Sequence, residues 1–386
     1  MSIHSESPLK CFSDLAGAPA THMVFAPGRV NLSGEHTDYN GGFVLPMAID
    51  LGISIAARKR EDLLVNLWTA QNGDVPVVID LAQPITKSLP NWTNYVRGVL
   101  AGLKQAGLNL PGFDAVIYAN LPAGGGLSSS AALEIAVAML GELLAGQTLD
   151  PIQRSLLCQM AEHEFAGTPC GIMDQFAVSF GRKGHLLLLD CQSQEFKLVP
   201  MPTGEVSLLV INSMVKHALS DGEYKKRRDD CHAAAKLLNV AELRNVTSTQ
   251  VETAKDLLSD QLYRRARHVT TENERTLAAV EALQLGNWAE LGALMFASHA
   301  SLRNDYDVSC FELDTIVESA QKHGVYGCRM TGGGFGGCCI ALVQTTQASA
   351  ISQAIHADYL AATGRAPRIF ITEPSDGPQI LLQPSA

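Results

Sequence analysis

At 386 residues, with 46% hydrophobic and 18% charged residues, the chain is long enough for two domains and too apolar to be disordered. Its formal net charge of -10 makes it a poor electrostatic partner for nucleic acid or an anionic membrane, so neither is expected as a partner. We find no signal-peptide core and no bilayer-length apolar run, and the 9 cysteines contain no CxxC pair, which indicates reduced thiols in a cytoplasm.

The first part of the chain alternates between strand and helix signals. Three apolar runs rich in β-forming residues predict strands at residues 43–58, 63–68 and 114–120. An apolar series from Leu133 to Leu144 has helical spacing and places Glu134 and Glu142 on the opposite face. Asp150 and the proline after it predict the cap and first turn of a helix that runs to about residue 166.

The second part carries strand signals at both ends and helical sequence between them. Strands are predicted at 184–191, 207–212 and 339–343, mostly helical sequence at about 222–324, and a last helix and strand at about 346–372. Pro200, Pro202 and Gly204 cluster before a new strand, so we divide the domains there. The basic run 225–228 is followed by two aspartates and is interpreted as solvated helix surface.

A glycine- and serine-rich loop at 122–130 lies between a predicted strand and a predicted helix. A helix N-terminus offers free backbone N–H groups, glycines allow close approach, and serine hydroxyls add donors or a metal ligand, all of which suit a phosphate. Walker A is excluded because no Gly-Lys-Ser/Thr follows, and the dinucleotide pattern fails at Ser129. The alternative is a tight turn with capping serines. We favour phosphate binding, without deciding which phosphate.

A second glycine cluster fills residues 331–337, just before the strand predicted at 339–343. Five glycines in six residues cost backbone entropy, so some close approach of chains is expected there. A hairpin or a close helix crossing explains this cluster as well as a functional role does.

Residues 26–42 pack polar side chains densely and are interpreted as a loop that leads into a buried strand at 43–49. The run Glu35, His36, Thr37 and Asp38 supplies donors and acceptors within a few residues, as a polyol site requires. A solvated loop or a metal site remain as alternatives. Metal ligands usually stand at wider spacings, so we rank a metal site below sugar binding.

Two further carboxylates stand out. Asp174 lies in an otherwise apolar stretch, where it is either an ion-pair partner or a base with a tuned pKa. Glu162 lies on the helix predicted to reach about residue 166, and composition alone would place it on the helix surface.

Together these segments resemble the galactokinases of the GHMP small-molecule kinase family. Residues 28–40 look like the galactokinase signature, 122–131 like the shared phosphate loop, and 332–337 like the third family motif. Residues 170–175 and 222–224 also fall where a galactokinase would have them, and the resemblance spans about 26–371.

The resemblance implies a two-domain α+β fold with the active site between the domains. The N-terminal domain, residues 1–203, would resemble the second domain of ribosomal protein S5. The C-terminal domain, residues 204–386, would be ferredoxin-like, and its last strand could return to the N-terminal domain. The expected state is a cytoplasmic monomer or weak dimer.

The resemblance also assigns roles to residues. Asp174 would be the general base and Arg29 its stabilising partner. The sugar would contact Glu35, His36, Thr37, Asp38, Gly171 and Tyr224. The ATP phosphates would lie against Gly124, Gly125, Gly126, Leu127, Ser128, Ser129 and Ser130, with Trp92 on the adenine side. Mg²⁺ would be held by Ser130 and Glu162.

The implied activity is transfer of the ATP γ-phosphate to the anomeric hydroxyl of galactose. Rivals are another GHMP kinase, such as an N-acetylgalactosamine, homoserine or mevalonate kinase, a non-catalytic galactose sensor on the same fold, and a nucleotide-binding protein with no sugar role. The intact serine-rich loop, Asp174 and Arg29 favour catalysis. Ser33 departs from the family pattern, which usually has isoleucine there, and this bears on local packing and hydroxyl selectivity.

Overall fold

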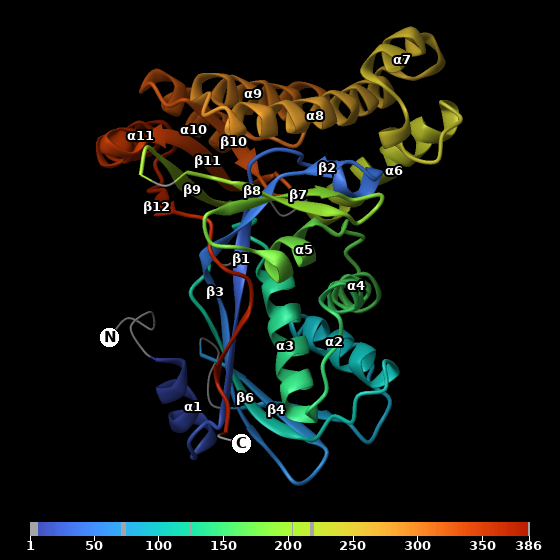
Figure 1. The fold of residues 1–386 in the computed structure, drawn as a ribbon, viewed down its shortest axis with the longest axis vertical. Helices are drawn as coiled ribbons and strands as arrows, with labels where there is room; N and C mark the ends of the chain where they lie inside the picture. The colour runs from blue at the N-terminus through green and yellow to red at the C-terminus, as the bar shows by residue number, and fades with distance from the viewer. Residues whose placement is uncertain (1–6, 71–74, 123–124, 203, 217–219, 385–386) are drawn as a thin grey trace.

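The computed structural model describes residues 7–70, 75–122, 125–202, 204–216 and 220–384. Long strands run through the lower part of the molecule with helices beside them, and a layer of helices lies across its upper end (Figure 1). No helix in these described ranges has the length and apolar character needed to cross a membrane. All 9 cysteines are free.

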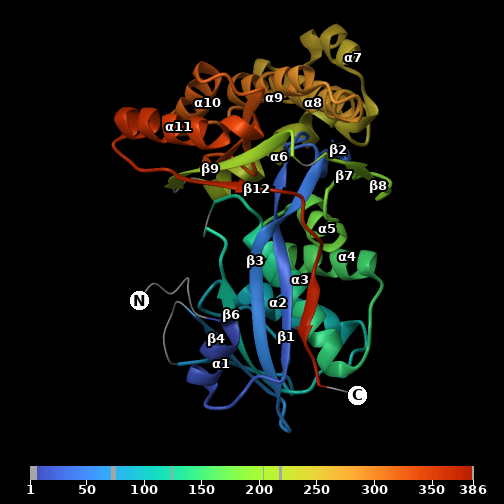
Figure 2. The ribbon, with the colours of Figure 1, turned by 60° about the vertical axis from the view of Figure 1, so that its left-hand side comes forward.

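A six-stranded sheet forms the lower part, in the order β13-β1-β3-β6-β4-β5. Its strands are β1 (His22–Asn31), β3 (Pro46–Lys59), β4 (Leu64–Thr69), β5 (Val77–Asp80), β6 (Phe113–Ala119) and β13 (Gln379–Leu382). The predicted strands at 43–58, 63–68 and 114–120 are thus confirmed, with β2 (Phe43–Val44) preceding β3. After β12 (Arg368–Thr372) the chain descends beside β1 and pairs with it as β13 (Figure 2).

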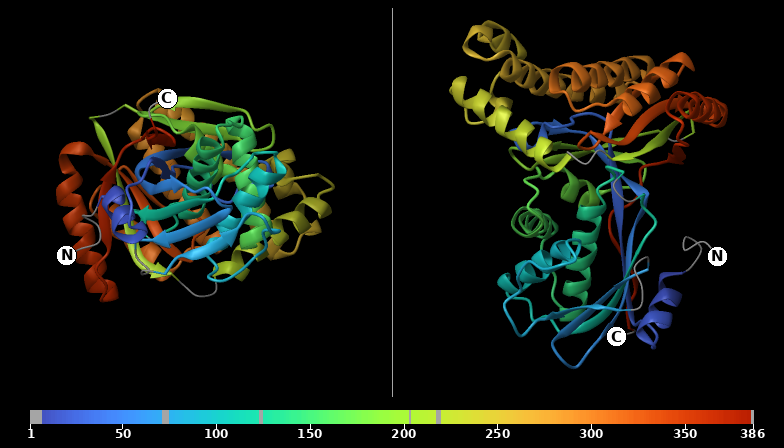
Figure 3. Two further views of the ribbon diagram at one scale, coloured as in Figure 1. Left: turned by 90° about the horizontal axis from the view of Figure 1, so that it is seen from below. Right: turned by 180° about the vertical axis from the view of Figure 1, so that it is seen from behind.

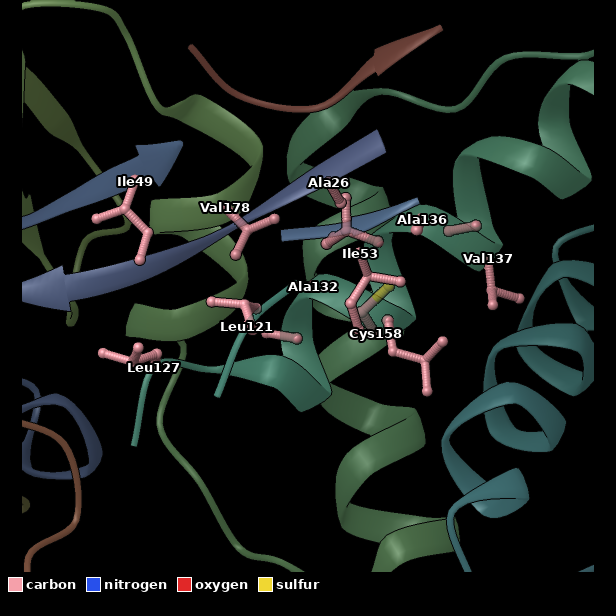
Figure 4. Packing of buried hydrophobic residues seen from close by; sticks show 14 of the residues in the cluster. Ala26, Ile49, Ile53, Leu121, Leu127, Ala132, Ala136, Val137, Cys158 and Val178 are labelled. Atoms are coloured by element: carbon pink, nitrogen blue, oxygen red, sulfur yellow. The ribbon is translucent and has the colours of Figure 1, made fainter. Parts of the chain in front are cut away.

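Helices cover one face of this sheet and bury the main core. They are α2 (Thr93–Gln105), α3 (Ser129–Ala145), α4 (Pro151–Ala161) and α5 (Met173–Phe180), while α1 (Pro8–Ala16) packs on the other face through Phe12. Apolar side chains from strands and helices meet in this core (Figure 4), among them Ala26, Ile53, Ala136 and Cys158. Burial at this scale supplies roughly 25 cal/mol per Å² of apolar surface, and here it fixes the elements that carry the site.

Residues 26–31 are strand, which corrects the predicted loop. The prediction relied on glycine punctuation and on the density of polar side chains, and Gly28 would usually interrupt a strand. Here the register between β1 and β3 shifts between Pro27 and Arg29, a bulge that accommodates Pro27 and Gly28. The polar side chains of Arg29 and Asn31 are buried rather than in water. The signature segment therefore begins inside the sheet.

Glu134 and Glu142 are both buried, which corrects the prediction of an outward face for them. Helix α3 packs against the sheet and against α2, α4 and α5, so few of its positions reach water. Arg154 donates two hydrogen bonds to Glu142, at 2.6 and 2.8 Å. No cation among the described residues pairs with Glu134.

The upper part contains a four-stranded sheet, β10-β11-β9-β12, and a three-stranded sheet, β2-β7-β8. The strands not yet given are β7 (His185–Asp190), β8 (Phe196–Pro200), β9 (Val206–Lys216), β10 (Gly327–Thr331) and β11 (Gly336–Gln344). The predicted strands at 184–191, 207–212 and 339–343 are confirmed as β7, β9 and β11, whereas β8 and β10 were not predicted.

Helices form the outer layer of the upper part, and seen from behind they lie across the ends of the strands (Figure 3). They are α6 (Ser220–Leu237), α7 (Ser248–Thr253), α8 (Asp260–Gln284), α9 (Trp288–Ser301), α10 (Phe311–Lys322) and α11 (Ala348–Thr363). The predicted helical region at about 222–324 is confirmed.

The basic run 225–228 on α6 is only partly solvated. Lys225 is exposed and pairs with Asp229, as predicted. Arg227 is buried and donates to the backbone oxygens of Tyr306 and Asp307, which corrects the prediction for that residue. Its guanidinium connects α6 to the turn that ends α9.

Candidate active site

The glycine- and serine-rich loop joins β6 to α3, as predicted. Gly126 and Ser128 both have positive φ, 72° and 58°, so the chain turns sharply before the helix begins. Ser128 occupies the N-cap position, yet its hydroxyl makes no capping bond and donates instead to Asp174 Oδ2 at 2.5 Å. The backbone N–H groups of the first turn of α3 are consequently free of a side-chain cap.

Asp174 and Arg29 lie side by side, although 145 residues separate them. Arg29 Nε donates to Asp174 Oδ1 at 2.8 Å and Nη2 lies 2.7 Å from the same oxygen. A third guanidinium nitrogen, Nη1, donates to the carbonyl oxygen of Gly126 at 2.6 Å. Burial alone would lower the pKa of Arg29, but Asp174 and Glu35 outweigh it and the pKa is raised. Arg29 therefore stays charged and connects Asp174 to the phosphate loop.

The signature segment continues from β1 as a buried turn. Glu35 Oε1 accepts hydrogen bonds from Thr331 Oγ1 at 3.0 Å and from the backbone N–H of Gly332 at 2.7 Å. The Thr37 hydroxyl lies within hydrogen-bond distance of the backbone oxygens of Gly34 and Phe43, so it holds the turn together.

His36 is buried and points into a cluster of tyrosine rings. Its Nδ1 bonds Tyr39 Oη at 2.8 Å, and its Nε2 lies 3.2 Å from the carbonyl oxygen of Gly333. The Tyr224 ring lies 5.5 Å from the imidazole, centroid to centroid. Burial lowers the pKa of His36 to about 3, so the ring is neutral at physiological pH.

Asp38 and Gly171 are neighbours. A Cβ at position 171 would lie 2.1 Å from Asp38 Oδ2, so only glycine fits there beside this carboxylate. Burial, and then the charge of Asp174, raises the pKa of Asp38 to about 7. Asp38 is only partly buried, whereas Glu35, His36 and Thr37 are buried.

The second glycine cluster is the hairpin between β10 and β11, and it is also a point of close approach. A Cβ at Gly332 would lie 2.8 Å from the carbonyl oxygen of Gly126. A Cβ at Gly337 would lie 3.2 Å from that of Gly125. The hairpin therefore packs against the phosphate loop and bonds the signature segment through Glu35 and His36.

Three carboxylates, Glu134, Glu162 and Asp174, form what we call the carboxylate cluster. Gln175 Nε2 bridges Glu134 Oε2 at 3.1 Å and Glu162 Oε2 at 3.0 Å, and the Ser130 hydroxyl is near enough to Glu162 to lower its pKa slightly. Burial, then the charge of Asp174, raises the pKa of Glu162 to about 7. Burial, then Glu162, raises the pKa of Glu134 well above its usual range.

Within the described part of the chain, no three His, Cys, Asp or Glu side chains are arranged to hold a metal ion. Ser130 and Glu162 lie together but make up only a pair of oxygen ligands. The Oε1 of Glu134 and the Oε1 of Gln175, both buried, have no hydrogen-bond partner among the described residues. Sequence analysis missed Glu134 and Gln175, although Gln175 directly follows Asp174.

The remaining predicted residues are placed as follows. Leu127 is in the main core, and its carbonyl oxygen accepts from the N–H of Arg29 at 3.1 Å. Ser129 is the first residue of α3. Trp92 packs, partly buried, against the main core at the start of α2. Gly124 lies outside the described residues.

A cavity of about 270 Å³ opens between the two parts of the molecule. It is lined by residues 166–169 from the lower part, and by Tyr224, Lys225 and residues 333–335 from the upper part. Its walls thus include the third motif and the predicted sugar residue Tyr224.

Three family models match the chain. A galactokinase galactose-binding signature covers residues 10–59, a GHMP kinase N-terminal domain covers 94–182, and a GHMP kinase C-terminal domain covers 279–361. The galactokinase of Homo sapiens is 44% identical over 379 residues, which cover 96% of this chain and 95% of the relative. The chain belongs to the galactokinase family. The galactokinase of Chloroflexus aurantiacus is 46% identical over 360 residues, which cover 92% of this chain and 92% of the relative.

Solved structures agree with this membership. The galactokinase of Lactococcus lactis complexed with galactose matches with a TM-score of 0.93 at 35% identity, covering 97% of this chain and 98% of that one. The mevalonate kinase of Methanococcus jannaschii matches at 20% identity with a TM-score of 0.66, over 92% of this chain and 99% of that one, which shows a shared fold. The predicted two-domain GHMP kinase fold is confirmed, and galactokinase family members are ATP-dependent sugar kinases.

Proposed function

We propose that this galactokinase-family chain transfers the γ-phosphate of ATP to the C1 hydroxyl of galactose. One observation supports this most directly: Asp174 lies between the Arg29 guanidinium and the Ser128 hydroxyl, at the junction of phosphate loop and signature segment. A carboxylate held this way can receive a proton from a hydroxyl beside the phosphate loop. Phosphoryl transfer depends mostly on positioning and charge stabilisation, which these groups supply.

In the proposed step, Asp174 accepts the proton of the galactose C1 hydroxyl. The C1 oxygen forms a bond to the γ-phosphorus, the bond from that phosphorus to the bridging oxygen breaks, and ADP leaves. Arg29 holds Asp174 in place through two close contacts and stabilises negative charge on the transferred group. The free N–H groups at the start of α3, with Gly125, Gly126 and residues 127–130, receive the ATP phosphates.

The residues near the carboxylate cluster fit Mg²⁺. A hydroxyl and a carboxylate, Ser130 and Glu162, are the hard oxygen ligands that this ion takes with few protein groups. Glu134 lies close by, and its buried Oε1 has no hydrogen-bond partner among the described residues, so this oxygen is left available beside the pair. When bound, Mg²⁺ would neutralise phosphate charge. This chain's own part is to hold Glu162 in place beside Ser130 through the hydrogen bond from Gln175.

The sugar would bind against the signature segment, in contact with Glu35, His36, Thr37, Asp38, Gly171 and Tyr224. Asp38 is the best placed of these to accept a sugar hydroxyl, because it remains partly exposed beside Asp174. The imidazole nitrogens of His36 and the hydroxyl of Thr37 already bond within the protein, so their part would be to shape the site.

The wider proposals follow the same family. The domains would divide into residues 1–203 and 204–386, with β13 returning to the first. Galactose and ATP would be the substrates, Trp92 would lie on the adenine side, and the enzyme would act in the cytoplasm as a monomer or weak dimer.

An ADP-release assay tests the proposed substrate. ATP would be offered with galactose, glucose, 2-deoxygalactose, N-acetylgalactosamine, homoserine or mevalonate. We expect galactose to give the highest kcat/KM. Faster turnover of N-acetylgalactosamine or mevalonate would assign the chain to another GHMP activity, and galactose binding without ADP release would indicate a sensor.

A further inference from the structure

One face of α8 is polar although it is buried. His268, Glu272 and Thr276 follow one another at four-residue spacing, and Asn273 lies next to them on the same side of the helix. His268, Glu272 and Thr276 are fully buried, and Asn273 is 8% exposed. Buried polar groups are costly unless they are paired, so this face needs a specific partner.

The partner is residues 33–43, which comprise the part of the signature segment that follows β1 and the residues that lead into β2. Every side chain of the α8 polar face bonds it: His268 Nε2 to Glu35 O at 3.1 Å, Glu272 Oε1 to Gly34 N at 3.0 Å, Asn273 Oδ1 to Phe43 N at 2.8 Å, and Thr276 Oγ1 to Ser33 Oγ at 3.0 Å. The bonds reach both ends of the segment, and Figure 1 shows α8 lying just above β2. An isoleucine at position 33 could not make the bond to Thr276.

Glu272 is the centre of this arrangement. Its Oε1 also accepts from Ser298 Oγ at 2.6 Å, and its Oε2 accepts from Arg275 Nε at 2.7 Å. These bonds fix the carboxylate that accepts the hydrogen bond from the backbone N–H of Gly34. Gly34 has a positive φ of 95°, and this turn sets the direction in which the chain continues to Glu35.

Arg329 links Glu272 to Glu35 by charge. Its guanidinium is fully buried on β10, with Nη2 3.7 Å from Glu35 Oε1 and 4.0 Å from Glu272 Oε1. Neither Nε nor Nη2 has a hydrogen-bond partner among the described residues, so the two carboxylates hold this cation mainly electrostatically. Removing the charge of Glu272 leaves Glu35 as the remaining carboxylate beside Arg329 and draws Glu35 towards it.

We infer that the α8 polar face is a positioning element that sets the affinity for the sugar, with Glu272 as its main residue. The inference rests on the proposed function, because the sugar in question is galactose. The face bonds residues 33–43, whereas Arg29, Ser128 and Asp174 set the transfer step from the lower part. Changes on α8 should therefore weaken sugar binding and leave turnover at saturating sugar nearly intact. If the α8 polar face only held the two parts of the molecule together, its substitution would instead change stability without a selective effect on galactose affinity.

The test uses the full chain with Glu272→Gln, and Glu281→Gln as the matched control, an exposed glutamate on the same helix. Galactose Kd is measured by calorimetry, and KM for galactose and ATP with kcat by ADP release. Loss of a charge-assisted hydrogen bond predicts ~10-fold or more weaker galactose binding for Glu272→Gln. The KM for ATP and kcat should stay within about threefold, and Glu281→Gln should match the wild type.

A second variant keeps the test decisive if Glu272→Gln does not fold. Thr276→Val keeps the side-chain shape and removes the hydroxyl that meets Ser33, so galactose Kd should rise ~2- to 10-fold, again without a change in ATP KM. The inference is overturned if the folded variants bind galactose as the wild type does, or lose ATP and galactose affinity equally. If the wild type binds no galactose, the proposed function fails instead.

Discussion

Two buried polar regions of the molecule satisfy their groups in opposite ways. In the signature segment, Glu35 and Thr37 bond donors or acceptors of the protein itself, and α8 adds further bonds from the upper part. In the carboxylate cluster, Glu134 and Gln175 each keep an oxygen that no described residue bonds, and the pKa values of Glu134 and Glu162 are raised.

The signature segment is built to keep a fixed shape, whereas the carboxylate cluster is built to hold a charged group. A network whose groups are paired is rigid and suits recognition of a fixed arrangement of hydroxyls. A cluster with surplus negative charge favours a cation and suits charge that changes during a reaction. Substitutions in the first region should therefore alter binding, and substitutions in the second should alter turnover and metal dependence.

The largest effect is expected for Asp174→Asn. Without a base for the sugar hydroxyl, kcat should fall by roughly 10²–10⁴-fold, the usual worth of general base catalysis. Galactose binding should change little, because Asn keeps the side-chain shape. Single-turnover rates and calorimetry on the same preparation measure both. Near-normal turnover with both substrates bound would rule out the base assignment and remove the contrast between the regions.

Two glutamates on α3 test whether the effect of a buried carboxylate on stability depends on a paired cation. Glu142→Gln leaves Arg154 without its counter-charge and should cost about 3–5 kcal/mol of unfolding free energy. Glu134→Gln should cost less than about 1 kcal/mol, because no cation among the described residues depends on its charge and burial raises the pKa of that carboxyl, which favours the neutral form. Urea denaturation of both variants measures the difference. Equal losses would show that Glu134 is ionised and paired.

Glu162→Gln tests the proposed metal pair. The apparent affinity for Mg²⁺ should fall by at least ~10-fold, since a ligand or its support is removed. A titration of Mg²⁺ against nucleotide binding measures this independently of turnover. Glu164→Gln, an exposed neighbour, is the control and should leave the affinity unchanged. An unaltered Mg²⁺ affinity in Glu162→Gln would show that Ser130 and Glu162 are not the metal site.

The last prediction concerns Asp38 and the pH dependence of stability. Its pKa of about 7 in the fold exceeds that of an unfolded aspartate, so the folded state binds the extra proton. The contribution of Asp38 to stability is greatest below about pH 4 and is lost as pH rises towards 7, by at most about 1.4 kcal/mol per pH unit. Asp38→Asn should remove that loss. Thermal unfolding at pH 5 and pH 7.5 without substrates checks it. An identical pH dependence in the variant would contradict the raised pKa.

Much of the fold could be predicted from local patterns, and the failures share a cause. The β-rich runs and the long helical region were visible because burial imposes a period on one element at a time. Glu134 was placed outward because its polarity was taken for exposure, although α3 is surrounded by other elements. Residues 26–31 were predicted to be loop because glycines punctuate the segment and apolar residues are sparse in it, and only the pairing with β3 shows the strand and its bulge.

The candidate site also contains residues that could be predicted from the sequence and residues that could not. Resemblance paired Arg29 with Asp174, and the structure places them in contact. The α8 residues were not predicted, because His268 and Thr276 look like ordinary helix positions until the fold brings residues 33–43 against them. Ser33, the one departure from the family pattern, could be noticed from sequence. Its partner Thr276 could not, since 243 residues separate the two.

The most direct test of the central claim is the structure of the product. Galactose labelled with ¹³C at C1 would be incubated with ATP, Mg²⁺ and the enzyme, and the product examined by ³¹P and ¹³C NMR. The account predicts a phosphate coupled to C1, in amounts equal to the ADP released. A phosphate on another carbon, or ADP release without any sugar phosphate, would contradict it.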